Sequence, residues 1–232
     1  MTPSMPVLAQ ETLEAVGAPF SVERMLEVRA KTRDAINEIA ANIKVGMVEE
    51  DAVEMAKEML AARSMLRGWH DVYVRFGPNT LKTFGAPSDP GVVLGNTDLF
   101  FLDIGPVFED WEGDGGATFT VGDDPSMAQC ARDAEKLFHL VRRKWLLDRS
   151  SGKSLYEFAV AEAQKLGWEL NMDLSGHRLS DFPHAAIYDG PLADVDFTPS
   201  PLLWILEIHI RHPEQRFGAF FEDMLLDDSY FA

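Results

Sequence analysis

The stretch LDIGPVFEDWEGDGGATFTVG, residues 102–122, decides the fold class of this chain. It is typical of a β-hairpin, because an aliphatic and aromatic run at 99–107 and a β-branched run at 117–121 flank a turn-like segment at 108–113. Each strand carries one carboxylate, Asp103 and Asp114. If the turn centres near Phe108–Glu109, these carboxylates face each other with Cβ atoms roughly 5 Å apart. Like charges at that distance need a proton or a cation between them.

A second hairpin near the C-terminus carries another pair of acids. The strand-like run PLLWILEIHIR, residues 201–211, contains Glu207, and the run FGAFFEDMLL, residues 217–226, contains Glu222. One pair of acids near a turn most often reflects turn chemistry. Charged residues inside two hydrophobic strands, however, are seldom buried without a partner or a metal. Two acidic hairpins together predict the frame of a dinuclear metal site.

The order of the predicted elements suggests a duplication. Apolar spacing predicts helices at 21–43 and 49–65, followed by strands up to residue 121. A helix opening at Pro125 and a shorter helix ending at Gly167 then precede the remaining strands. The order helix, helix, strands therefore occurs twice, although no sequence repeat is visible. We expect an α+β fold made of two pseudo-symmetric halves.

Two of the six histidines are candidate nitrogen ligands. Between the two acidic hairpins lie Gly176-His177 and, seven residues later, His184. A lone histidine is most often a hydrogen-bonded core residue, but here a nitrogen ligand would complete a carboxylate-rich site. Such mixed sites suit Mn, Co, Fe and Zn, whereas Ca and Mg prefer oxygen alone. The remaining four show no comparable placement in the sequence: His70, His139, His209 and His212.

These residues together resemble the family of methionine aminopeptidase, prolidase, aminopeptidase P and creatinase, which has the pita-bread fold. The pattern KxGMxE at residues 44–49 is a further point of similarity. The resemblance implies a single catalytic domain at 21–232, built around a curved antiparallel sheet and preceded by an N-terminal arm at 1–20. It also implies five metal ligands: Asp103, Asp114, His177, Glu207 and Glu222. His184 would touch the substrate.

The implied activity is that of a dinuclear metal-dependent hydrolase. Two divalent ions (Mn, Co, Fe or Zn) would share a hydroxide, lower its pKa and polarise the scissile carbonyl of a small peptide or amide. By the same resemblance, Glu207 would relay protons and His184 would stabilise the tetrahedral intermediate. An aminopeptidase or a Xaa-Pro-type peptidase is the expected function.

One position departs sharply from the family pattern. The segment FGAPSD at 84–89 places Phe84 where many members carry a catalytic histidine. Losing such a donor typically costs ~10²–10³ in rate. Phe84 either projects into the substrate pocket or packs into the core, and both alternatives stay open. The departure also keeps a second function open, namely a catalytically weak or inactive pita-bread domain that binds a peptide or protein.

Composition narrows the partners and the compartment. A formal net charge of −17 disfavours nucleic acid and anionic membranes. No apolar run reaches the ~18 residues of a membrane span, and the first residues lack the features of a secretory signal. The single cysteine, Cys130, cannot form an intrachain disulfide. We expect a cytoplasmic protein. The N-terminal arm at 1–20 could pack on a second subunit, which makes a homodimer a possible assembly.

Overall fold

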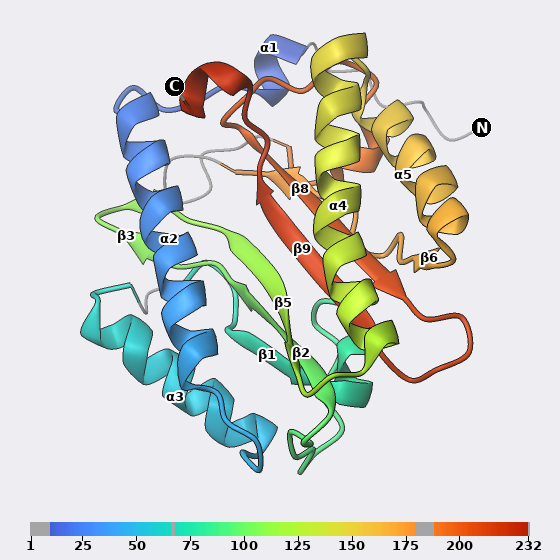
Figure 1. Ribbon diagram of the computed structural model, residues 1–232. Helices are drawn as coiled ribbons and strands as arrows, with labels where there is room; N and C mark the ends of the chain where they lie inside the picture. Colours follow the sequence, from blue (N-terminus) through green and yellow to red (C-terminus); the bar gives the residue numbers. More distant parts are fainter. Residues whose placement is uncertain (1–9, 66–67, 180–187, 232) are drawn as a thin grey trace, which may run out of the picture.

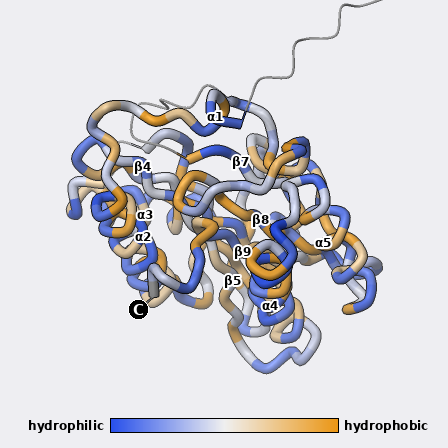
Figure 2. The backbone as a smooth tube through the Cα atoms, turned by 90° about the horizontal axis from the view of Figure 1, so that it is seen from above, coloured by the Kyte–Doolittle hydropathy of each residue, from blue (hydrophilic) through white to orange (hydrophobic). Residues whose placement is uncertain are grey.

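The computed structural model describes residues 10–65, 68–179 and 188–231. Within this part of the chain, seven strands form one antiparallel sheet in the order β1-β2-β5-β9-β8-β6, with β7 also paired to β8. In Figure 1, α2 and α4 cross in front of the strands, with α3 beside α2 and α5 beside α4. In the view of Figure 2, β5, β9 and β8 lie between the pair α2/α3 and the pair α4/α5.

The predicted order of helix, helix and strands occurs twice. The first half contains α1 (Gln10–Leu13), α2 (Val22–Asn42), α3 (Glu49–Ala62), β1 (Tyr73–Phe76), η1 (Gly77–Leu81), β2 (Asp98–Ile104), β3 (Val107–Phe108), β4 (Trp111–Glu112) and β5 (Gly115–Val121). The second half contains α4 (Pro125–Asp148), α5 (Gly152–Leu166), β6 (Glu169–Leu170), β7 (His177–Arg178), η2 (Leu192–Asp194), β8 (Trp204–Arg211), β9 (Gly218–Met224) and η3 (Asp228–Phe231).

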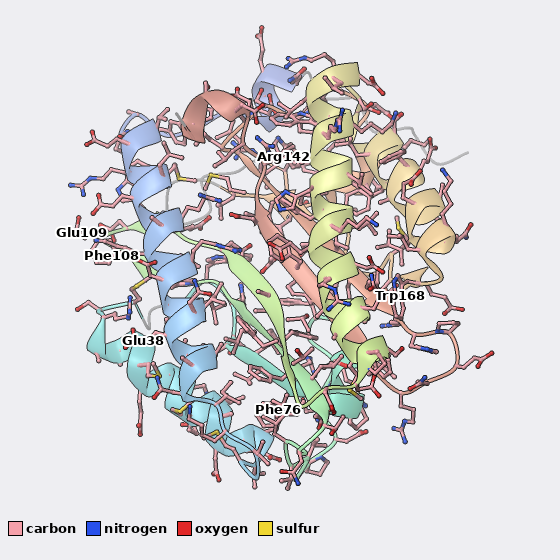
Figure 3. The ribbon with its side chains drawn as sticks, viewed as in Figure 1. Glu38, Phe76, Phe108, Glu109, Arg142 and Trp168 are labelled. Atoms are coloured by element: carbon pink, nitrogen blue, oxygen red, sulfur yellow. The ribbon has the colours of Figure 1, made fainter. Side chains whose placement is uncertain are left out.

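Each helix pair packs its apolar side on the strands of its own half. Ile36 and Ile39 of α2 share a buried cluster with Phe100 and Leu102 of β2. A second cluster joins α4 and α5 to β8 and β9, with Trp168 at its edge. The indole Nε1 of Trp168 donates to Asp133 Oδ2 at 2.9 Å, which fixes the end of α5 beside α4 (Figure 3).

The first hairpin has a different register from the one predicted. Asp103 pairs with Gly116, not with Asp114, because the turn falls one residue further along the chain. Glu109 and Asp110 form this turn and both have positive φ, at 49° and 75°, as a two-residue type I′ turn requires. The tip lies beside α2 (Figure 3), where Lys31 Nζ is 3.2 Å from the ring centroid of Phe108.

The second hairpin pairs its two acids directly, since Glu207 lies opposite Glu222. Because Gly116 also pairs with Glu222, one transverse row crosses the sheet from Asp103 through Gly116 and Glu222 to Glu207. Side chains alternate between the two faces of a strand. The adjacent Asp223 binds Arg29 of α2, so the row of acids points to the face away from the helices.

The described part of the N-terminal segment packs on the second half. The carboxylate of Glu14 accepts hydrogen bonds from the backbone and hydroxyl of Ser200 and from the indole of Trp204. Arg178 donates to the carbonyl oxygens of Leu13 and Ala15. Among the described helices, none combines the length and apolar character of a membrane span.

Candidate metal centre

Four carboxylates meet on the face of the sheet opposite the helices. Asp103, Glu207 and Glu222 stand in the transverse row, and Asp114 comes directly before β5. All four are buried, with exposed fractions between 1% for Glu222 and 8% for Glu207. They line one pocket of about 330 Å³ together with His177. The structure therefore brings together all five residues that the resemblance implied as ligands.

A glycine keeps the centre of this row open. Gly116 stands between Asp103 and Glu222, and directly paired residues point to the same face of an antiparallel sheet. A Cβ at Gly116 would lie 2.4 Å from Cε1 of Phe220 and 2.8 Å from the carbonyl oxygen of Leu102. No side chain therefore separates the carboxylates of the two hairpins at this point.

His177 presents its Nε2 to the acids. Its Nδ1 lies 2.9 Å from the carbonyl oxygen of Arg178, and because a carbonyl only accepts, Nδ1 carries a proton. Nε2 lies 2.8 Å from Asp114 Oδ2. In the neutral ring this nitrogen bears a lone pair, which repels a carboxylate unless a proton or a metal ion lies between them. Metal-bound histidines are commonly held in this way, through the other ring nitrogen.

His70 also reaches the site, and the interpretation that it lacks a comparable placement was wrong. Its Nε2 lies 3.5 Å from Asp103 Oδ1 and 3.5 Å from Asp114 Oδ1, and its side chain is only 5% exposed. The signal that could have found it is the pairing of β1 with β2, in which Tyr73 lies opposite Asp103. That register places the residues just before β1 at the acidic end of β2.

Aromatic rings form the apolar wall of the pocket. Trp69 packs its ring edge-on against both histidines, with centroids 4.4 Å from His70 and 5.0 Å from His177. Phe84 lines the pocket, remains 48% exposed and lies edge-on to His70 at 5.5 Å. The structure thus places Phe84 at the pocket and not in the core. The predicted substrate contact His184 lies outside the described residues.

Burial and mutual repulsion shape the titration of the acids. Burial raises the pKa of Asp103 to about 7, against the opposing charge of His70 and with the help of Asp114. Burial, together with Asp114 and the other two acids, holds the pKa of Glu222 well above its usual range. Burial also acts on Asp114, but the imidazoles of His177 and His70 beside its carboxylate outweigh it and lower its pKa to about 2.

The two histidines titrate in the opposite sense to an isolated buried imidazole. Burial alone would lower the pKa of His70, but the charges of Asp103 and Asp114 raise it to about 9. Burial likewise opposes the protonation of His177, and Asp114 and Glu207 raise its pKa to about 9. The acids therefore attract positive charge strongly enough to overcome desolvation.

The donor set fits divalent metal ions. Glu222 Oε1 and Asp114 Oδ2 are buried and have no hydrogen-bond partner among the described residues, although Nε2 of His177 lies 2.8 Å from Asp114 Oδ2. Buried polar atoms are seldom left in this state. Groups of donor atoms close enough to share one ion are formed by His70, Asp103 and Asp114 and by Asp114, His177 and Glu222. Carboxylate with imidazole suits Mn, Fe, Co and Zn.

Three solved peptidase structures have a similar fold. A prolidase from Pyrococcus horikoshii superposes with a TM-score of 0.71 at 14% identity, over 90% of this chain and 59% of its own. A Xaa-Pro dipeptidase from Bacillus anthracis superposes with a TM-score of 0.73 at 16% identity, over 94% of this chain and 61% of its own. A methionine aminopeptidase from Thermotoga maritima superposes with a TM-score of 0.69 at 15% identity, over 92% of this chain and 99% of its own. The chain thus spans about three fifths of the two prolidase-type chains and nearly all of the third.

These neighbours confirm the pita-bread fold expected from the sequence. A search of curated protein sequences returned no significant match. The Peptidase_M24 sequence profile, described as metallopeptidase family M24, matches residues 23–226, which is most of the chain. This span includes both acidic hairpins, His70 and His177. The chain therefore belongs to metallopeptidase family M24.

Proposed function

We propose that this chain is a metal-dependent peptidase that releases the N-terminal residue of short peptides. Two divalent ions would be held by Asp103, Asp114, His177, Glu207 and Glu222. The observation that carries the proposal is the presence of four buried carboxylates in one pocket, two of them with an oxygen that lacks a good hydrogen bond. Four negative charges match two divalent cations. A domain that only binds peptides has no need to bury four carboxylates together, because burying unpaired charges costs free energy.

Ions bound there would polarise the scissile carbonyl and bring the pKa of water toward neutrality. The chain's own groups orient the substrate and handle protons. Glu207 is held through Oε2, which accepts a hydrogen bond of 2.8 Å from the backbone of Gly176. Glu222 lies directly opposite Glu207 in the neighbouring strand. Glu207 is thus placed to accept and release a proton beside the scissile bond, and His184 is proposed to contact the substrate.

The charge of the pocket favours the amino end of a peptide over the carboxyl end. With the four central acids balanced by two divalent ions, Asp173 and Asp189 still give its lining a negative charge, and among the described lining residues there is no lysine or arginine. An acidic pocket attracts an α-ammonium group and repels an α-carboxylate. Its volume lies at the small end of the range for ligand pockets, ~300–1,000 Å³. Short peptides or the free N-terminus of a longer chain are the proposed substrates.

Phe84 supports a second candidate, a pita-bread domain that binds peptides but turns them over slowly. Its half-exposed ring lies in the pocket next to His70, and phenylalanine cannot donate a hydrogen bond to a developing oxyanion. The same ring offers an apolar contact for a peptide side chain. The two candidates share the metal site and differ in the rate of hydrolysis.

The test is to measure bound metal and hydrolysis on one preparation. The protein is stripped with a chelator, reloaded separately with Mn, Co, Fe or Zn, and assayed on Xaa-Pro, Met-Xaa and other dipeptides. We expect about two ions per chain and hydrolysis that a chelator abolishes. The Glu222→Gln protein serves as the matched inactive control. Metal binding without turnover on any peptide favours the binding domain, and a chain that takes up no metal overturns both candidates.

A further inference from the structure

The segment before β1 brings a second imidazole to the proposed metal centre. His70 Nε2 is equidistant, at 3.5 Å, from one oxygen of Asp103 and one of Asp114. That distance is long for a strong hydrogen bond. It agrees with the edge of a coordination shell, because two atoms about 2.1 Å from a tetrahedral ion lie about 3.4 Å apart. The three donors are therefore spaced to share one ion.

The ring of His70 is oriented in the same way as that of His177. His70 Nδ1 lies 2.6 Å from the carbonyl oxygen of Asp71, and His177 Nδ1 lies 2.9 Å from that of Arg178. In both cases the acceptor belongs to the next residue in the chain. Both neutral rings therefore carry the proton on Nδ1 and direct the Nε2 lone pair toward Asp114. Each half of the molecule thus offers one imidazole in the tautomer that binds metal.

The neighbouring backbone holds this ring in place. A Cβ at Gly105 would lie 2.2 Å from Cδ2 of His70, so the ring fits only because that residue is glycine. Trp69 is fixed by two bonds, from its backbone N–H to Gly105 and from its indole N–H to Gly113, both at 3.0 Å. Its ring then packs against His70. Little room remains for the imidazole to turn away from the acids.

An ion between the same two acids would lie within coordination reach of His70 Nε2, because the three donor atoms lie within 4.8 Å of one another. The ring would then bind that ion through the Nε2 lone pair, or it would have to leave its packed position. Because Gly105 and Trp69 hold the ring in its packed position, binding of the ion by His70 is favoured. A ligand role for His70 rests on the proposed metal centre and extends it from five ligands to six.

We propose that His70 is a ligand of the ion held by Asp103 and Asp114, as His177 is of the ion held by Asp114 and Glu222. Each ion then has one nitrogen donor within an oxygen-rich set. A nitrogen donor strengthens the preference for Zn, Co and Fe over Mg and Ca. The position also places His70 next to Phe84, so the first half keeps an imidazole at the pocket although residue 84 is not histidine.

Metal stoichiometry gives the first test. Wild type, His70→Ala and His139→Ala are dialysed against Zn²⁺ or Mn²⁺ and their metal content is measured, with circular dichroism to check folding. His139 is an exposed histidine of α4 and serves as the matched control. We expect two ions in wild type and control. In His70→Ala the second ion should bind at least tenfold more weakly, since even outer partners of ligands contribute 10–100-fold.

A pulsed EPR experiment gives the second test. In His177→Ala protein with one equivalent of Mn²⁺, His70 would be the remaining imidazole ligand, so ¹⁴N modulation of the imidazole type should persist. In the double variant His70→Ala/His177→Ala the modulation should disappear. Two ions of unchanged affinity in His70→Ala, or no ¹⁴N modulation in His177→Ala, would overturn the role of His70 alone. A wild type that binds no metal would instead refute the metal centre itself.

Discussion

The two halves supply the same chemistry through different geometry. Each contributes two carboxylates and one imidazole that face the same pocket. In the second half, Glu207 and Glu222 lie directly opposite each other within two long strands. In the first half, Asp103 pairs with Gly116, and Asp114 lies before β5 begins. The second pair of acids is therefore positioned by sheet register, and the first partly by the turn that precedes the strand.

This difference determines which acid is shared. Asp114, released from the row, lies within reach of both candidate groups, with His70 and Asp103 on one side and with His177 and Glu222 on the other. An acid inside a paired strand, by contrast, has its position fixed by the register of that strand. The less regular hairpin thus provides the residue that joins the two halves of the site. Substitutions at equivalent positions in the two halves test whether Asp114 alone is shared.

The largest effect is expected at Asp114. Asp114→Asn should remove both ions, because its carboxylate belongs to both donor groups. Asp103→Ala should remove only the ion on the side of His70, and Glu222→Ala at least the ion on the side of His177. Metal analysis after dialysis measures all three. Full metal occupancy in any of them would show that the ligand assignment is wrong.

Without metal, the free energy of unfolding should fall as pH rises. Asp103 has a folded pKa of about 7, above that of the unfolded chain, so its contribution is lost as pH rises toward 7. His70 and His177 have folded pKa values of about 9. Their stabilisation is fully present below pH 6.5 and is lost as pH rises through 9. Each histidine contributes roughly 3 kcal/mol at most.

Urea unfolding in excess chelator between pH 6 and 9 checks this prediction. His70→Ala and His177→Ala should each flatten the decline of the free energy of unfolding, by similar amounts, because the two rings are held alike. Divalent metal should abolish the decline, since metal binding displaces the protons and stabilises the folded chain. A metal-free chain whose stability rises over this pH range would contradict the charges assigned to the site.

The sequence predicted the acids better than the histidines, for physical reasons. A charged residue such as Glu207 inside an apolar strand is visible, because alternation fixes its face and its neighbours. His70 was missed because it precedes a strand of only four residues, which is too short for its periodicity to indicate a site. The turn was misplaced by one residue because Glu109 and Asp110 adopt positive φ without glycine. An error of one residue in the turn moved the predicted partner of Asp103 by two.

A smaller effect is expected at Phe84, where the first half departs from the family pattern. Its ring already lines the pocket, so Phe84→His should add a hydrogen-bond donor on the substrate side and leave metal content unchanged. Turnover of a dipeptide should rise about tenfold or more, as part of the ~10²–10³ that one such donor provides. Phe84→Leu is the matched control. A folded, metal-loaded Phe84→His protein with no gain on any peptide would refute this role.

The smallest effect compares the helix caps that begin the two halves. Asp124 Oδ1 accepts a hydrogen bond of 2.8 Å from Met127 N at the start of α4, whereas Ser21 Oγ accepts one of 3.4 Å from Arg24 N at the start of α2. The first bond is shorter, and its charged acceptor also interacts favourably with the helix dipole. Asp124→Ala should therefore lower the free energy of unfolding by about 1 kcal/mol or more, and Ser21→Ala by about 0.5 kcal/mol. Urea unfolding of the metal-loaded variants at pH 7 measures both. Equal costs would mean that the length of the capping bond does not distinguish the two halves, and a larger cost at Ser21 would reverse the order argued from these distances.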